Sequence, residues 1–174
     1  PPPKAAASWI RPDSVDARCL EGLREGGFTR VSFGMQSAVP HVLAALDRTP
    51  QPGRPQAAVA EAKSAGFEQV SLDLIYGAPG ESDVDWQTSM DAALEAEPTH
   101  VSAYALIVEE GTKLGAQVRR GDVPMPDDDA LADRYVLAAQ SLGPLGWYGV
   151  SNSGEPCRPT PAYGPRGTWV GARP

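Results

Sequence analysis

The chain contains few metal-binding side chains for its length, with two cysteines and two histidines among 174 residues. Neither Cys19 nor Cys157 belongs to a CxxC-type pattern, so this chain alone predicts no metal or cluster site. Cys19 lies in a helical pattern, and we expect it to be a small core residue. For His41 and His100, each alone in its segment, a structural role outweighs ligation.

Basic residues and long apolar runs are also scarce. The formal net charge is -7 and the pI is near 4.8, which argues against a nucleic-acid-binding surface because phosphate contacts depend on a basic patch. No apolar run approaches the roughly 20 residues that a transmembrane helix needs, and no secretory segment is visible. We therefore predict a soluble, cytoplasmic protein that binds no nucleic acid.

One strand pattern contains an acid where an apolar residue is expected. In residues 69–82, QVSLDLIYGAPGES, apolar side chains alternate with Ser71, Asp73 and Ile75 until a Gly-Ala-Pro-Gly turn. Burying Asp73 costs on the order of several kcal/mol unless a partner hydrogen-bonds it. Two interpretations have about equal weight: the partner of Asp73 is a ligand, or it is a neighbouring side chain or backbone group.

Two other segments repeat this design. Residues 30–36, RVSFGMQ, place Ser32, Gly34 and Gln36 on one face, and residues 100–108, HVSAYALIV, place Ser102 and Tyr104 on one face. Helical patterns at 39–46, 57–65 and 84–94 separate the strands, which predicts parallel neighbours with right-handed crossovers. The polar faces favour a barrel, whose ligands bind at the carboxyl ends of strands, over an open sheet with continuously apolar strands.

The length of the chain limits this barrel. A full eight-fold barrel takes about 250 residues, and we count four to five strand units, so we predict an α/β protein with a partial (β/α) barrel. We expect an irregular N-terminal end over residues 1–12, the partial barrel and a following helical segment over 13–152, and an irregular Gly/Pro-rich tail over 153–174. Residues 147–152 predict a last short strand.

Two turn regions predict helix caps. The triple aspartate 127–129 begins a helical pattern that runs to residue 142, and capping is favoured over a metal site because no spaced-ligand loop follows. The glycines of the GAPG turn could hold a phosphate, but the better interpretation is a strand-to-helix turn capped by Ser82 or Asp83.

Six blocks of sequence occur in an order that resembles one known family: FTRVSFGMQS, LDRT, GFEQVSLDLIYGAPGES, HVSAYALIVEEGT, PDDDALADRY and GWYGVSN. They are similar to the actinobacterial branch of the heme chaperones, relatives of oxygen-independent coproporphyrinogen III oxidase in the radical S-adenosylmethionine superfamily. The similarity covers roughly residues 13–152 and is specific because long blocks occur in register. It implies a partial barrel, S-adenosylmethionine, a four-iron four-sulfur cluster, and heme that is passed to respiratory proteins.

The resemblance implies that Gln36, Arg48 and Asp73 bind S-adenosylmethionine. An amide and a carboxylate can bind ribose hydroxyls or an ammonium group, and Arg48 can pair with the methionyl carboxylate. These three residues are expected to bind the cofactor, and no catalytic residue is expected among them.

The chain also departs from the family pattern. The CxxxCxxC loop and the glycine-rich strand after it are absent, Trp9 replaces a glutamate, Pro50 replaces a histidine, and residues 159–164 replace a His-Asn motif linked to heme binding. We therefore expect a truncated heme chaperone without its N-terminal barrel strands, with no cluster on this chain and no activity alone. The alternatives are oxygen-independent coproporphyrinogen III oxidase, an enzyme of porphyrin synthesis, and an inert fragment.

Overall fold

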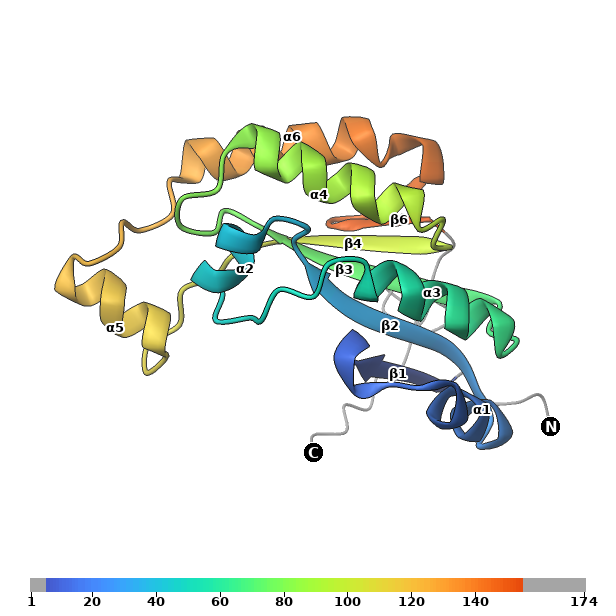
Figure 1. The fold of residues 1–174 in the computed structure, drawn as a ribbon. Helices are drawn as coiled ribbons and strands as arrows, with labels where there is room; N and C mark the ends of the chain where they lie inside the picture. The colour runs from blue at the N-terminus through green and yellow to red at the C-terminus, as the bar shows by residue number, and fades with distance from the viewer. Residues whose placement is uncertain (1–5, 155–174) are drawn as a thin grey trace, which may run out of the picture.

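A six-stranded sheet forms the centre of the computed structural model, which describes residues 6–154 (Figure 1). The sheet order is β1-β2-β3-β4-β6-β5; β1 to β4 are parallel, and β6 is antiparallel to β4 and β5. The strands are β1 (Ala6–Ile10), β2 (Phe28–Gln36), β3 (Gln69–Tyr76), β4 (His100–Ala105), β5 (Trp147–Gly149) and β6 (Asn152–Gly154). The three parallel strands predicted from the alternating segments are confirmed.

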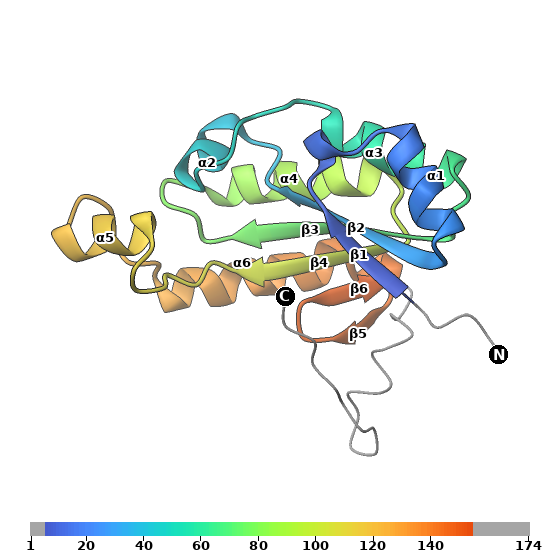
Figure 2. The ribbon, with the colours of Figure 1, turned by 90° about the horizontal axis from the view of Figure 1, so that it is seen from below.

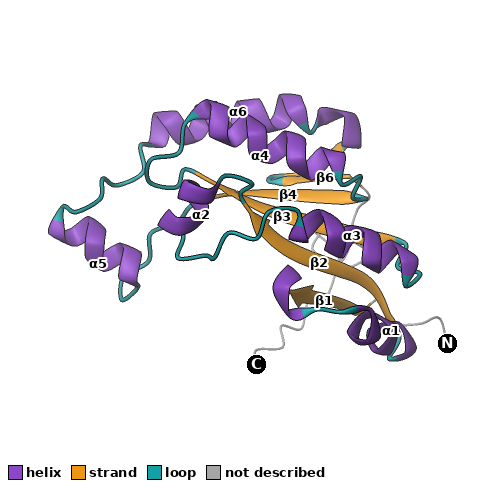
Figure 3. Ribbon diagram, in the orientation of Figure 1, coloured by secondary structure: helices purple, strands orange, loops and turns teal. Residues whose placement is uncertain are grey.

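Helices connect the parallel strands (Figure 3). They are α1 (Ala17–Glu25), α2 (Pro40–Ala45), α3 (Arg54–Ser64), α4 (Asp83–Glu95), α5 (Lys113–Arg120) and α6 (Asp128–Ser141), with short 3-10 turns η1 (Pro12–Ser14) and η2 (Gly143–Leu145). The helices α1, α3, α4 and α6 pack on one face of the sheet, whereas α5 projects from the body and buries none of its residues. Helices on a single face agree with the predicted partial (β/α) barrel, since an open doubly wound sheet has helices on both faces.

The core lies between the sheet and these helices. Val70, Leu72, Leu74 and Tyr76 of β3 point to the helices, and the Tyr76 ring lies 5.2 Å from the ring of Trp86 in α4. Because side chains alternate along a strand, the residues between them point to the opposite face, which we call the inner face. The ribbon seen from below shows the strands of this sheet side by side (Figure 2). The inner face is formed by the side chains of Arg30, Ser32, Ser71, Asp73, His100 and Ser102.

The predicted caps are confirmed. The Ser82 hydroxyl accepts from the amide of Asp85 at 3.2 Å, and the Asp85 carboxylate accepts from the amide of Ser82 at 2.8 Å, which forms a capping box at α4. Asp127 caps α6 by accepting from the amide of Asp129. These caps position the turn after β3 and the start of α6.

Three predictions differ from the structure. Residues 6–10 form β1 instead of an irregular end, because pairing with β2 outweighs the weak strand preference of this alanine-containing segment. Cys19 is exposed, and Leu20 is the buried residue of α1. The last strand is a hairpin of β5 and β6, because Ser151 adopts a positive φ of 72° between them. This hairpin includes residues 153–154, which we expected in the irregular tail over 153–174. The rest of that predicted tail, including residues 159–164, lies outside the described residues.

Candidate ligand-binding site

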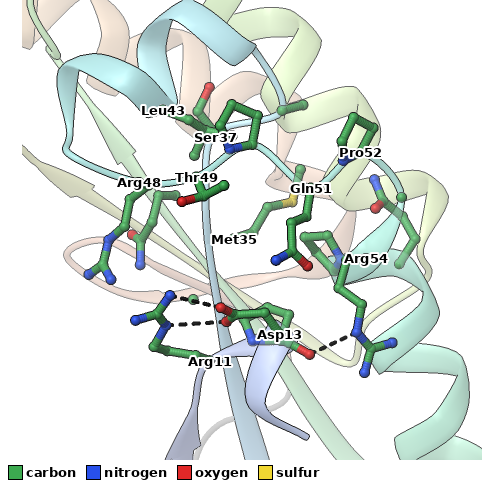
Figure 4. Close-up of a pocket in the computed structure, with 18 of the residues that line it drawn as sticks. Arg11, Asp13, Met35, Ser37, Leu43, Arg48, Thr49, Gln51, Pro52 and Arg54 are labelled. Atoms are coloured by element: carbon green, nitrogen blue, oxygen red, sulfur yellow. Dashed lines mark hydrogen bonds and ion pairs between the residues drawn. The ribbon is translucent and has the colours of Figure 1, made fainter.

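A cavity of about 340 Å³ opens at the carboxyl ends of β1 and β2 (Figure 4). Its lining comes from Ile10 of β1, the end of β2, η1, and the loop between α2 and α3. Gln36 and Arg48, two of the residues predicted to bind a ligand, both line it. The cavity therefore lies where parallel α/β barrels bind their ligands, and its volume suits a small molecule.

Of the arginines around this cavity, Arg48 is the one available to a ligand. Arg11 pairs with Asp13 at 2.8 Å, and this hydrogen-bonded pairing lowers the pKa of Asp13 (Figure 4). Arg54 donates to both carboxylate oxygens of Glu61 and to two backbone carbonyls, so it joins η1 and α3. Arg48 is exposed and makes no hydrogen bond from its side chain to the described residues.

Gln36 presents its amide group beside this cavity. Its backbone has a φ of 66°, which side-chain-bearing residues rarely adopt, at a bulge in the pairing of β2 with β3. The amide turns back over Gly34, where an added Cβ would lie 2.6 Å from Gln36 Nε2. Gln36 is 8% exposed, and its side chain hydrogen-bonds to no described residue. Gln36 can therefore donate to and accept from a ligand.

Asp73 lies on the inner face, in register with Gly34, and is 3% exposed. The Ser32 hydroxyl donates to Asp73 Oδ2 at 2.6 Å. Burial raises the pKa of Asp73, while hydrogen bonds from Ser32 and Ser102 and the charge of Arg30 oppose this increase. A neighbouring serine is thus one partner of the buried carboxylate.

The structure brings two of the three predicted residues together. Gln36 and Arg48 share the cavity, whereas Asp73 lies on the inner face, in register with the Gly34 over which the Gln36 amide turns. Asp73 itself is not a lining residue of the cavity. Gln36 is therefore the link between the cavity and the inner face.

Sequence reasoning missed a buried network around His100. Nδ1 of His100 lies 2.7 Å from the Ser71 hydroxyl, and Nε2 lies 2.6 Å from the Tyr148 hydroxyl. Burial, together with the charge of Arg30, lowers the pKa of His100 to about 4. Both ring nitrogens are engaged, so His100 is unsuited to bind a metal. The alternating pattern did contain a signal, because Arg30 and His100 begin the inner faces of their strands.

The other histidine and the acidic residues give no metal site. His41 is exposed, with Nε2 3.4 Å from Asp85 Oδ2. Within residues 6–154, no three His, Cys, Asp or Glu side chains are grouped closely enough to hold a metal ion. In the same residues, no helix combines the length and apolar character needed to cross a membrane.

Comparison with curated proteins gives relatives along most of the chain. The chain is 49% identical to "Heme chaperone HemW" of Mycobacterium tuberculosis, over 99% of this chain and 46% of that protein. It is 32% identical to "Heme chaperone HemW" of Synechocystis, over 88% of the chain, and 34% identical to the mouse "Radical S-adenosyl methionine domain-containing protein 1, mitochondrial", over 81%. The chain thus spans less than half the length of these relatives. No protein-family model matches it.

Solved structures give the same fold. The structure superimposes on coproporphyrinogen III oxidase of Escherichia coli, described as a radical SAM enzyme, with a TM-score of 0.68 and 23% identity. That match covers 90% of this chain and 36% of the oxidase chain. A match to the archaeal Elp3 of Methanocaldococcus infernus has a TM-score of 0.62 and 27% identity over 68% of the chain. The chain belongs to the heme chaperone family of the radical S-adenosylmethionine superfamily.

Proposed function

We propose that this chain forms the S-adenosylmethionine-binding part of a heme chaperone, with Gln36, Arg48 and Asp73 as the residues that bind the cofactor. The observation that carries the proposal is the amide of Gln36. It has no partner among the described residues and lies between a cavity lined by Arg48 and the inner face that carries Asp73. The names of the mouse and bacterial relatives support the identity of the ligand.

The chemistry of these three groups fits S-adenosylmethionine. Arg48 has a guanidinium available for the methionyl carboxylate, which it can bind through two parallel hydrogen bonds. The Gln36 amide both donates and accepts, and the Asp73 carboxylate accepts, which suits ribose hydroxyls and the ammonium group. Gly34 fits the same role, because the absence of a Cβ there leaves room for the Gln36 amide.

An iron–sulfur cluster does not fit the cysteines of this chain. Such clusters are held by several thiolates. Cys19 is exposed on α1, and Cys157 lies outside the described residues. Bound S-adenosylmethionine supplies radical chemistry only after reduction by a cluster, so we assign binding and no radical step to the residues of this chain.

Heme binding and transfer to respiratory proteins are proposed for the whole protein. The relatives named heme chaperones support this proposal. Within residues 6–154, His41 is the histidine whose imidazole is accessible, since His100 is buried between Ser71 and Tyr148. Coproporphyrinogen III oxidase stays the alternative because of the shared fold. Heme titration of the whole protein distinguishes a heme chaperone from this oxidase.

Isothermal titration of this chain with S-adenosylmethionine tests the cofactor proposal. Each of the variants Gln36→Ala, Arg48→Ala and Asp73→Ala is expected to bind at least about tenfold more weakly, since a charged hydrogen bond contributes about 1.5–3 kcal/mol. Arg120→Ala is the matched control, because Arg120 is exposed, pairs with Asp122, and does not line the cavity. Equal affinity of all four variants, or no binding by the parent chain, would contradict the proposal.

A further inference from the structure

The hydroxyl of Ser32 donates a hydrogen bond to one carboxylate oxygen of Asp73, its diagonal neighbour across strands β2 and β3. Across β2 and β3, Ser32 pairs with Ser71 and Gly34 pairs with Asp73, so Ser32 lies one inner-face position before the residue opposite Asp73. The residue directly opposite, Gly34, has no side chain that could contact the carboxylate. The 2.6 Å bond from Ser32 Oγ to Oδ2 is therefore the contact that β2 provides.

The groups around Ser32 and Asp73 influence whether the Asp73 carboxyl is ionised. The titratable or charged side chains that share the inner face with Asp73 are Arg30 from β2 and His100 and Tyr104 from β4, and Tyr148 from β5 bonds to His100. Of these, Arg30 is the permanent cation, is 8% exposed, and leaves its buried Nη1 without a partner. His100 stays neutral at pH 7 because burial and Arg30 lower its pKa to about 4. Arg30 is therefore the counter-charge of Asp73.

Hydrogen-bond donors and a nearby positive charge both favour the ionised form of a buried carboxylate. The Ser102 hydroxyl is shared between two acceptors, Asp73 and Asn152, whose Oδ1 lies 3.3 Å from it. The Ser32 hydroxyl has no second acceptor among the described residues. Ser32 is thus the donor dedicated to Asp73.

We infer that Ser32 is a positioning residue for cofactor binding, which orients the carboxylate of Asp73 and keeps it ionised, with Arg30 as its counter-charge. This inference rests on the proposed binding of S-adenosylmethionine by Asp73. It extends that function to two inner-face residues that do not line the cavity. The ionised form matters because a protonated acid loses the charge that attracts an ammonium group.

The first test measures the carboxyl of Asp73 directly, without any ligand. The ¹³C resonance of this carboxyl is followed against pH in the parent chain and in Ser32→Ala, Ser32→Thr and Ser64→Ala. We expect Ser32→Ala to raise the pKa of Asp73, because the ionised form loses its donor, and Ser32→Thr to restore the parent value. Ser64→Ala is the control, since Ser64 bonds only within α3. If Ser32→Ala does not fold, Ser32→Cys replaces it as a weak donor of similar size.

The second test measures affinity for S-adenosylmethionine in the same variants. We expect Ser32→Ala to bind about tenfold more weakly, which corresponds to about 1.4 kcal/mol, with the loss of affinity on acidification moved to higher pH. Ser32→Thr should bind like the parent. An unchanged Asp73 pKa and unchanged affinity in Ser32→Ala would overturn the positioning role. If the parent chain does not bind S-adenosylmethionine, the proposed function fails, and the carboxyl titration still decides whether Ser32 controls Asp73.

Discussion

The hydroxyl of Tyr148 lies 2.6 Å from Nε2 of His100, so the short strand β5 completes a network that begins at Ser71. The His100 ring is 1% exposed, and the rings of His100 and Tyr148 lie 5.6 Å apart. Because burial and the charge of Arg30 both disfavour the imidazolium, the folded chain holds His100 in its neutral form. Stability must then depend on pH.

We predict that the free energy of unfolding falls as the pH decreases from about 6.5 to about 4. The folded pKa of His100 is lower than the unfolded value, so in this range the unfolded chain binds more protons. Neutral His100 contributes on the order of 3 kcal/mol to the free energy of unfolding, and this contribution is fully present above pH 6.5. Urea unfolding of the parent and of His100→Asn at a series of pH values measures it. The difference in the free energy of unfolding between the two chains should change in this pH range.

Asp73→Asn should stabilise the fold and weaken cofactor binding. Burial raises the pKa of Asp73, so the native carboxyl contributes stability when protonated, and this stability is lost as pH rises through the folded pKa. Asparagine is neutral at every pH and can still accept from Ser32. We expect a higher melting temperature at pH 7 and affinity for S-adenosylmethionine reduced by at least about tenfold. If Asp73→Asn is less stable than the unsubstituted chain at pH 7, burial of the ionised Asp73 carboxylate does not destabilise the fold.

Gly34→Ala should displace the Gln36 amide. The new Cβ would lie 2.6 Å from Nε2, so the side chain must move away from the position between the cavity and Asp73. We expect about a tenfold loss of affinity for S-adenosylmethionine. Gly22→Ala in α1 is the control, since no atom lies within 4 Å of its added Cβ, and it should raise stability by about 0.5–1 kcal/mol while affinity stays unchanged. Equal effects of the two substitutions on affinity would reject this role of Gly34.

Arg134→Ala should destabilise the turn after β3. Arg134 Nη2 donates to the carbonyl of Glu81 at 2.7 Å, and Nε lies 3.9 Å from the buried Glu81 carboxylate, which accepts from the amide of Gly77. Removing the cation leaves Glu81, 7% exposed, without its charge partner. We expect a loss of about 2 kcal/mol in the free energy of unfolding. Arg120→Ala, at an exposed pair, should cost less than about 1 kcal/mol, and thermal or urea unfolding compares the two.

Anaerobic reconstitution with iron and sulfide should give no stable four-iron cluster on this chain. The sequence contains two cysteines, far apart along the chain, and a cluster needs more thiolates than these. Iron and sulfide analysis after gel filtration, together with the charge-transfer absorption, measures the outcome. About four irons per chain that remain bound through gel filtration would show that other ligands hold a cluster.

The sequence by itself determined the main strands, most helices and the caps. The alternation around Asp73 predicted β3 and its inner face, because side chains on a strand alternate with a period of two whatever the neighbouring strands are. Ser82 and Asp127 predicted the starts of α4 and α6, because a cap bonds amides only two or three residues away. The similarity to heme chaperones also followed from the order of sequence blocks, and the relatives confirm it.

The tertiary structure alone decided which of these residues meet. The alignment of Ser32 with Asp73, 41 residues further along the chain, depends on the register of β2 and β3, and no local pattern determines that register. The assignment of residues 6–10 to β1 and the exposure of Cys19 likewise depend on what neighbouring elements cover. The turn of Gln36 over Gly34 required a bulge and a positive φ, which arise from the end of strand pairing. Long-range packing therefore placed Gln36 and Arg48 in one cavity and turned the Gln36 amide over Gly34, the residue in register with Asp73. Local periodicity predicted only which face of its strand each side chain occupies.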